Sequence, residues 1–433
     1  MKNINYKNLR RRFINNLLGF HFFYPYKKLK IIGVTGTNGK TTTATLLYRI
    51  ATSLGYRAGL ISTVEHIIAG ELKIAEGNKP STSPDLPYLN KLLREIVDKK
   101  CQYVFMEVTS IALDQNRTAG IKFTGGIFTN LTQDHLDYHK DMEEYFQAKK
   151  KFFKMLSKDA FALTNIDDEY GLKMLEGIQT KKSTYSFPAR NASSIANAGG
   201  ENNSDFQGEI KKLDFNGLEL DFNGNQIKSK LLGKFNAYNL LAAWSTCQML
   251  GFDMKNVNKI LESIAPPVGR FDHFMSKSGV LVIVDYAHTP DALQKVLLTI
   301  EEIKSKEGLP RFDGRGRIIS VFGCGGDRDV SKRSKMGRIG VALSDIAIFT
   351  SDNPRSEDPN KIIADMAAEL TSKDMQKVKR IENRSEAIKE AVKSAQRGDI
   401  ILCAGKGHED YQEINGVKSH FNDMEELKKA FSV

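Results

Sequence analysis

Cysteine is scarce in this sequence. The four cysteines among 433 residues, Cys101, Cys247, Cys324 and Cys403, lie far apart and form no CxxC pair. A disulfide scaffold and a structural zinc site are therefore poor interpretations, and we expect a reducing compartment. With 41% hydrophobic and 27% charged residues, the composition also lacks the features of a disordered chain, a collagen or a membrane bundle. A globular protein of two or three domains is expected at this length.

Acidic residues are absent from the first 30 positions, which hold eight basic side chains. The net charge of +11 is therefore mostly local, and only +3 belongs to the other 403 residues. A surplus of positive charge favours a polyanion-binding protein when it is spread over a domain. Because most of this chain is near charge balance, we expect no nucleic-acid partner.

An apolar and aromatic segment, residues 13–24, lies between these basic clusters, with apolar pairs at helical spacing. It is too short and too polar to span a bilayer, which needs about 20 apolar residues. It also lacks the small-residue cleavage site of a signal peptide. Two interpretations stay open: a peripheral contact of residues 1–30 with an anionic membrane surface, or a helix packed on the main domain or on a partner.

From residue 30 onward, short apolar runs alternate with amphipathic helical stretches, which is typical of parallel α/β sheets. We expect strands at 30–34, 103–106, 126–128, 161–163, 281–284, 318–322, 347–349 and 400–403. Most of these runs end in a cluster of polar residues. Ligands of open α/β sheets bind at the carboxyl ends of the strands, so the sequence predicts a site there.

Residues 185–232 differ from the rest because they are rich in Asn, Gly and Ser and contain an alternating apolar run at 217–222. We expect hairpins that form a small antiparallel appendage, followed by a helix at about 236–250. Pro266 and Pro267 cannot continue a helix. We therefore expect a hinge there, with domains at 30–265 and 266–433 and a basic, aromatic segment at 1–29.

A strand, a glycine turn and a helix start follow one another in residues 31–43. Glycines let backbone N–H groups converge on phosphate oxygens, Lys40 can neutralise the β- and γ-phosphates, and Thr41 can coordinate Mg²⁺. The strict motif has Gly at position 34, where this chain has Val34. The pattern predicts ATP or GTP binding, and the alternative is a glycine-rich turn without a ligand.

The loop at 36–41, GTNGKT, resembles the phosphate loop of the Mur ligases, the ATP-dependent amide ligases of peptidoglycan synthesis. The resemblance continues through segments 106–110, 128–139, 323–328, 352–355 and 405–409. It implies an α/β fold, with a P-loop central ATPase domain of mostly parallel sheet at 30–265 and a Rossmann-like C-terminal domain at 266–433. Only about 30 residues precede the first strand, fewer than the family's N-terminal uridine-binding domain needs.

Within the family, the motifs are similar to those of the ligases that add the third residue of the stem peptide. This resemblance implies a cytoplasmic enzyme that uses ATP to phosphorylate UDP-MurNAc-L-Ala-D-Glu and joins the acyl phosphate to meso-diaminopimelate. Three alternatives stay open. They are a related ligase with a lipid-linked or non-nucleotide acceptor, the use of L-lysine instead of diaminopimelate, and a membrane-associated protein that binds ATP without catalysis.

The resemblance also assigns roles to residues that contact ATP and metal. For ATP these are Gly36, Thr37, Asn38, Gly39, Lys40, Thr41, Thr42, Asn239 and Arg270. Two Mg²⁺ sites are implied at Thr41, Glu107, His135 and a carbamylated Lys149, and the catalytic set is Lys40, Glu107, His135 and Lys149. Without the resemblance, Glu107 could be a salt-bridged strand end, His135 a structural histidine, and Lys149 part of a solvated basic helix face.

Binding of the two other substrates is assigned in the same way. The acceptor residues are Thr82, Ser83, Thr109, Gln115 and Arg117, and the diaminopimelate residues are Arg328, Asp352, Asn353, Pro354, Arg355, Gly405 and Glu409. A guanidinium at Arg355 can clamp a distal carboxylate with two hydrogen bonds, whereas it would repel the ammonium of L-lysine. The alternative for residues 353–355 is a simple turn after a strand.

Overall fold

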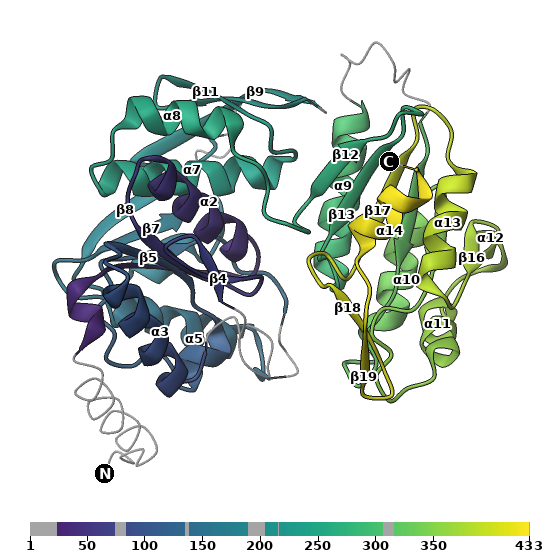
Figure 1. The fold of residues 1–433 in the computed structure, drawn as a ribbon, viewed down its shortest axis with the longest axis horizontal. Coiled ribbons are helices and arrows are strands. Elements are labelled where there is room, and N and C mark those ends of the chain that lie inside the picture. The colour runs from purple at the N-terminus through teal and green to yellow at the C-terminus, as the bar shows by residue number, and fades with distance from the viewer. Residues whose placement is uncertain are drawn as a thin grey trace, which may run out of the picture. The chain divides into compact units, whose positions relative to one another are not determined.

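The computed structural model describes residues 24–73, 84–134, 138–188, 204–214, 216–305 and 316–432 (Figure 1). The chain divides into two compact units, the first with residues 1–212 and 217–265 and the second with residues 213–216 and 266–433. Most of the basic, aromatic segment expected at 1–29 lies outside the described residues, and so do Thr82, Ser83 and His135.

An eleven-stranded sheet forms the centre of the first unit, in the order β11-β10-β9-β8-β7-β6-β1-β5-β2-β3-β4. Its parallel strands include β1 (Lys30–Thr35), β2 (Ala58–Ile61), β5 (Tyr103–Glu107), β6 (Gly125–Phe128), β7 (Phe161–Asn165) and β8 (Lys181–Ser186). The antiparallel edge consists of β3 (His66–Ile68) and β4 (Glu71–Lys73). Strands β5, β6 and β7 are buried throughout, as their continuous apolar runs predict for a sheet covered on both faces.

A hairpin is present in this region, as predicted, but the prediction of a separate appendage is wrong, because the strands continue the main sheet. These strands are β9 (Phe206–Asp214), β10 (Gly217–Phe222) and β11 (Asn225–Ser229). β10 and β11 form an antiparallel pair, and β9 pairs with β8 in parallel. The buried side chains of these strands pack against other elements. Phe222 of β10, for example, contacts Trp244, with ring centroids 5.7 Å apart.

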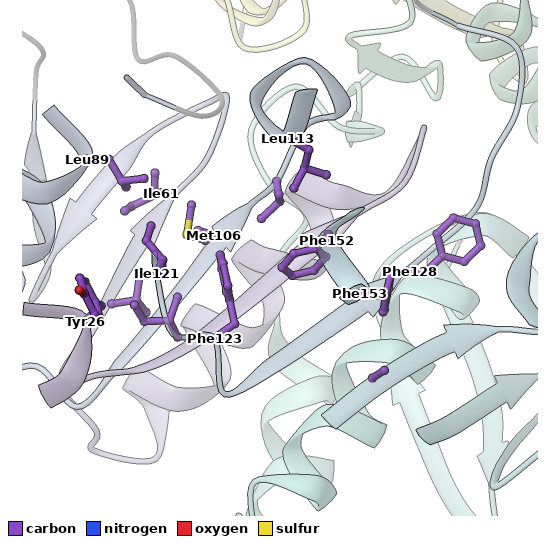
Figure 2. Close-up of a cluster of buried hydrophobic side chains, with 14 of the residues drawn as sticks. Tyr26, Ile61, Leu89, Met106, Leu113, Ile121, Phe123, Phe128, Phe152 and Phe153 are labelled. Carbon is purple, nitrogen blue, oxygen red and sulfur yellow. The ribbon is translucent and has the colours of Figure 1, made fainter. Parts of the chain in front are cut away.

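The first unit contains one 3-10 helix and seven α-helices among its described residues. They are η1 (Pro25–Lys28), α2 (Lys40–Ser53), α3 (Leu86–Asp98), α4 (Ser110–Asp114), α5 (Met142–Lys154), α6 (Gly171–Leu175), α7 (Lys234–Met249) and α8 (Met254–Ser263). Asp85 and Asp141 cap α3 and α5 by accepting from the backbone N–H groups three residues on. In the core, Phe123 and Phe152 meet edge to face with centroids 4.9 Å apart (Figure 2).

The second unit is built on a six-stranded sheet in the order β12-β13-β17-β14-β15-β16. The strands are β12 (Asp272–Met275), β13 (Leu281–Asp285), β14 (Ile318–Phe322), β15 (Ile346–Phe349), β16 (Val378–Arg380) and β17 (Ile400–Ala404). All neighbours are parallel except β12 and β13. The predicted α/β class with mostly parallel sheets is confirmed in both units.

Helices and a hairpin complete the second unit. The helices are α9 (Pro290–Ser305), α10 (Lys332–Ala342), α11 (Pro359–Ala367), α12 (Ser372–Met375), α13 (Arg384–Ser394) and α14 (Asp423–Ala430), and the hairpin strands are β18 (Tyr411–Ile414) and β19 (Val417–His420). α13 and α14 pack on the sheet through Ala387, Ile388 and Leu427 (Figure 1). Across the part of the chain that the structure describes, no helix combines the length and the apolar character needed to span a membrane.

Candidate active site

Three loops meet at the carboxyl ends of the central strands of the first sheet, because β6, β1 and β5 are adjacent and parallel. These loops begin with Gly36 after β1, Val108 after β5 and Thr129 after β6. The carboxyl ends of parallel strands point the same way, so residues assigned from distant parts of the sequence come together here.

The phosphate loop is held by the loop that follows β6. The N–H of Thr37 donates to the carbonyl of Asn130 at 2.8 Å, and the N–H of Asn38 donates to the Asn130 side-chain oxygen at 2.9 Å. Gly36 has a φ of +150°, and a Cβ there would overlap the Thr129 hydroxyl. A side chain at this position is therefore excluded by both backbone conformation and space.

Two lysine amines converge on one carbonyl of this loop. Nζ of Lys40 donates to the carbonyls of Gly36 at 3.0 Å and Thr37 at 2.7 Å, and Nζ of Lys149 donates to the Gly36 carbonyl at 2.8 Å. The Lys149 side chain is buried. Burial, and after it the positive charge of Lys40, hold the pKa of the Lys149 amine well below its usual value. Both effects disfavour the charged ammonium at this position.

Glu107 ends β5 as a fully buried carboxylate. One carboxylate oxygen accepts from the N–H of Thr63 at 2.8 Å, and the other accepts from the Thr63 hydroxyl at 3.1 Å. Glu107 and the hydroxyl of Thr41, at the start of α2, are oxygen donors of the kind that Mg²⁺ prefers. Thr63 was not identified from the sequence, since no motif marks it and it lies 44 positions before Glu107.

No group of three or more His, Cys, Asp or Glu side chains that could hold a metal ion occurs among the described residues, which do not include His135. Thr41 and Glu107 are two oxygen donors, fewer than the octahedral shell of Mg²⁺ takes. The Lys149 amine is a poor ligand as such, because Mg²⁺ prefers oxygen to nitrogen. Carbamylation would turn the same side chain into a carboxylate.

Tyr145 is a second residue that sequence reasoning missed. Its hydroxyl is 3.2 Å from that of Thr37 in the phosphate loop, and Lys149 Nζ lies 4.5 Å from the centre of its ring. The ring also stacks on His139, with centroids 5.1 Å apart. Nε2 of His139 is 3.0 Å from the hydroxyl of Ser110, the first residue of α4. The spacing of Tyr145 and Lys149, four apart on α5, was the available signal.

Three of the assigned acceptor residues gather around the short helix α4. The Thr109 hydroxyl caps this helix by accepting from the N–H of Ala112 at 3.2 Å. The side-chain oxygen of Gln115 accepts from Nε and Nη2 of Arg117 at 2.9 and 2.7 Å. Thr109 lies two residues after the end of β5, whereas Gln115 and Arg117 follow α4.

The two remaining ATP assignments fall in different units. Asn239 lies on α7 in the first unit, where a Cβ on Gly39 would collide with its side-chain oxygen, so it borders the phosphate loop. Arg270 belongs to the second unit, where its guanidinium stands 4.5 Å from the centre of the Tyr286 ring. Burial raises the pKa of the neighbouring Asp285, and the charge of Arg270 opposes that rise.

The residues assigned to diaminopimelate meet at the carboxyl ends of β14, β15 and β17 in the second unit. The Asn353 amide donates to Oε2 of Glu409 at 2.7 Å, and the N–H of Gly326 donates to the Asn353 carbonyl at 3.0 Å. Gly405 has a φ of +113°, and a Cβ on it would lie 2.6 Å from Oδ2 of Asp352. The loops are thus interlocked by contacts between all three strand ends.

The arginines of this cluster flank another glycine. A Cβ on Gly325 would lie 3.0 Å from Nη1 of Arg355 and 3.7 Å from Cγ of Arg328. Nη1 of Arg355 donates to the Gly326 carbonyl at 2.6 Å. Lys406, which was not singled out from the sequence, is fully buried and donates to the Asn353 side-chain oxygen at 3.1 Å. The cluster therefore combines cationic and anionic groups within one small region.

Two family models match the chain. One describes the Mur ligase middle domain and covers residues 34–247, and the other describes the glutamate ligase domain of Mur ligases and covers residues 269–407. The curated relatives include a protein of Parabacteroides distasonis named UDP-N-acetylmuramoyl-L-alanyl-D-glutamate--2,6-diaminopimelate ligase, which is 48% identical over 94% of this chain and 79% of its own length. A protein of the same name from Clostridium botulinum is 41% identical over 94% of this chain and 78% of its own length.

Solved structures show the same likeness. The structure of a ligase of that same name has a TM-score of 0.65 and 32% identity, and the match covers 96% of this chain and 82% of the other. A folylpolyglutamate synthase of Thermotoga maritima has a TM-score of 0.66 at 18% identity, over 92% of this chain and 93% of the other. The second likeness extends to the fold alone.

Proposed function

The chain belongs to the Mur ligase family, and we propose that it is the ATP-dependent ligase that adds meso-diaminopimelate to UDP-MurNAc-L-Ala-D-Glu in peptidoglycan precursor synthesis. The observation that carries the proposal is the convergence of Lys40 and Lys149 on the Gly36 carbonyl. A lysine beside a phosphate loop neutralises phosphate oxygens, and the family resemblance assigns the second, buried lysine to the metal site of these ligases. Relatives that share this sequence at 48% identity carry the name of this activity.

A carboxylate forms an amide only after activation. Transfer of the γ-phosphoryl group of ATP to the D-Glu carboxylate gives an acyl phosphate and ADP, and attack by the amine of diaminopimelate then releases phosphate. Most of the rate enhancement in such transfers comes from positioning and charge neutralisation. In this chain we assign the phosphate contacts to the backbone of residues 36–39, to Lys40 and to the hydroxyls of Thr41 and Thr42, and we place Asn239 beside them. For Arg270, a residue of the second unit, the nucleotide contact rests on the family resemblance alone.

Mur ligases use ATP and Mg²⁺. We assign two Mg²⁺ sites to Thr41, Glu107, His135 and a carbamylated Lys149, where bound Mg²⁺ would neutralise phosphate oxygens during transfer. The depressed pKa of Lys149 supports this assignment. In its neutral form the amine can attack carbon dioxide, form the N–C bond and release one proton, and the side chain then carries a carboxylate in place of the amine.

The substrate contacts are assigned to the two clusters described above. Thr109, Gln115 and Arg117, with Thr82 and Ser83, would hold the acceptor. Arg355 would clamp the distal carboxylate of diaminopimelate, Arg328 would bind its second carboxylate, and Glu409 would accept from its ammonium. L-Lysine lacks the distal carboxylate, so this arrangement favours diaminopimelate.

The test is ADP release by the purified chain. We expect turnover that requires both UDP-MurNAc-L-Ala-D-Glu and meso-diaminopimelate. Equal turnover with L-lysine would overturn the amino-acid assignment, and activity only with a lipid-linked or non-nucleotide acceptor would overturn the acceptor assignment.

Lys149→Ala should abolish ADP release, and a small carboxylate in the buffer should restore part of it, because the missing group is an oxygen ligand. Lys151→Ala is the matched control, since Lys151 lies on the same helix but is 42% exposed and pairs with Asp114. Full activity of Lys149→Ala, or an equal loss in both variants, would contradict the carbamate role.

We further propose a cytoplasmic enzyme that contacts the inner membrane surface through residues 1–30, on the strength of the eight basic side chains there. Flotation with anionic vesicles should recover the full chain and not a chain that begins at Lys30. Equal recovery of the two would contradict the membrane contact.

A further inference from the structure

The hairpin β18–β19 holds the backbone of Arg355. The N–H of Arg355 donates to the Glu413 carbonyl at 3.1 Å, and the N–H of Asn415 donates to the Arg355 carbonyl at 2.6 Å. Arg355 forms an isolated parallel bridge with Ile414, and its φ is +53°. A non-glycine residue in the left-handed region is held there by its surroundings. β18 therefore fixes Arg355 and places the side chain of residue 413 beside it.

That neighbouring side chain is a carboxylate. Oε2 of Glu413 lies 3.8 Å from Nε of Arg355, and the two side chains are 23% and 21% exposed. A separation of 3.8 Å is an ion pair without a direct hydrogen bond. Partly exposed pairs of this kind are weak and open to water, so another carboxylate can replace Glu413 at the guanidinium.

The second acidic residue of the cluster is held differently. Glu409 accepts from the Asn353 amide at 2.7 Å and from the Tyr411 hydroxyl at 3.1 Å. Lys406, whose side chain is fully buried, lies 3.5 Å from it. Glu409 is thus held by direct hydrogen bonds. Glu413, in contrast, lies 3.8 Å from Arg355 without a direct hydrogen bond, and both side chains are partly exposed.

We propose that the Glu413 carboxylate competes with the substrate for the Arg355 guanidinium and so sets the affinity for the distal carboxylate of the incoming amino acid. This inference rests on the proposed function. Diaminopimelate has to displace Glu413 from Arg355, because both carboxylates use the same cation. L-Lysine has the distal ammonium but no distal carboxylate, so it does not compete with Glu413 for Arg355. Glu413 therefore lowers the affinity for diaminopimelate. It also reduces the difference in affinity between diaminopimelate and L-lysine.

The test is Glu413→Gln, which removes the charge and keeps the size of the side chain and the backbone contacts of β18. We expect the KM for meso-diaminopimelate to fall about two- to fivefold, the range for a partly exposed ion pair. The kcat and the KM values for ATP and for the acceptor should not change. The KM for L-lysine, where turnover is measurable, should stay the same or rise. A purely structural role would not lower one KM alone.

Glu425→Gln is the matched control, because Glu425 pairs with His420 of the same hairpin and not with Arg355. It should leave the KM for diaminopimelate unchanged. Glu413→Ala is a second variant, and thermal melting of both shows whether the unit stays folded.

An unchanged or raised KM for diaminopimelate in both Glu413 variants, with wild-type chain active on diaminopimelate, overturns the competition alone. A wild-type chain that neither binds diaminopimelate in calorimetry nor turns it over overturns the proposed function instead, and the competition with it.

Discussion

A buried ion pair near the residues assigned to diaminopimelate offers the sharpest test of how the second unit is stabilised. Arg384, the first residue of α13, and Asp423, the first of α14, are both fully buried. Nε and Nη2 of Arg384 donate to the two carboxylate oxygens of Asp423, each at 2.7 Å. Nη2 also donates to the Ala404 carbonyl at 2.9 Å, at the end of β17. The pair therefore ties two helices to the strand end that carries Gly405.

Asp423→Asn removes the negative charge and leaves the guanidinium buried. Breaking a buried pair in this way costs about 3–5 kcal/mol, because one charge stays in the interior without its counter-charge. For a unit of 150–250 residues, about 1 kcal/mol corresponds to a shift of roughly 2–4 °C in Tm. We expect the melting transition of the second unit to fall by about 6–20 °C in scanning calorimetry.

Two comparisons make the result decisive. Replacing both partners, Arg384→Met with Asp423→Leu, should cost much less than Asp423→Asn, because no charge is left in the interior. Glu386→Gln should have no measurable effect, since Glu386 pairs with Lys389 on the surface of α13. A loss below about 1 kcal/mol in Asp423→Asn, or an equal loss in the double variant, would refute the reasoning that an uncompensated buried charge dominates.

Two further substitutions test the phosphate loop and the buried Glu107 carboxylate. Gly36→Ala should weaken ATP binding about tenfold or more in a nucleotide titration, since the added Cβ overlaps Thr129 in a strained conformation; an unchanged affinity would show that the loop relaxes freely. Thr63→Val removes one hydrogen bond to the Glu107 carboxylate and keeps the one from the backbone. A hydrogen bond to a charged group contributes about 1.5 kcal/mol, so kcat should fall up to about tenfold, and an unchanged kcat would mean that the hydroxyl does not orient Glu107.

The strands of both sheets could be predicted from the sequence because their apolar character is local. Each of the eight predicted apolar runs forms a strand in the structure. The helix expected at about 236–250 is α7, Lys234–Met249. The glycine turn after β1 could be placed for the same reason, since strand, turn and helix follow within 13 residues. A short run of neighbours suffices to decide such elements.

Pairing across long stretches of chain could not be predicted. Strands β9 to β11 were expected to form a separate unit, but they pair with the main sheet. Their alternate apolar residues are buried there against α7. The alternation of apolar residues predicts that a strand has an apolar face, but it does not predict which element packs against that face. The same limit hid Thr63, which reaches Glu107 from a separate strand end.

What the sequence determined by itself is the chemistry available: a phosphate loop, carboxylates and amines at strand ends, and an arginine in a turn. Only the tertiary structure decided their charge states and neighbours. Lys149 is one of three consecutive lysines, and it is distinguished by its hydrogen bond to a carbonyl 113 positions away. Arg355 likewise meets Glu413 through a hairpin 58 positions further on. Desolvation and ion pairing depend on distances in space, which packing sets and local sequence does not.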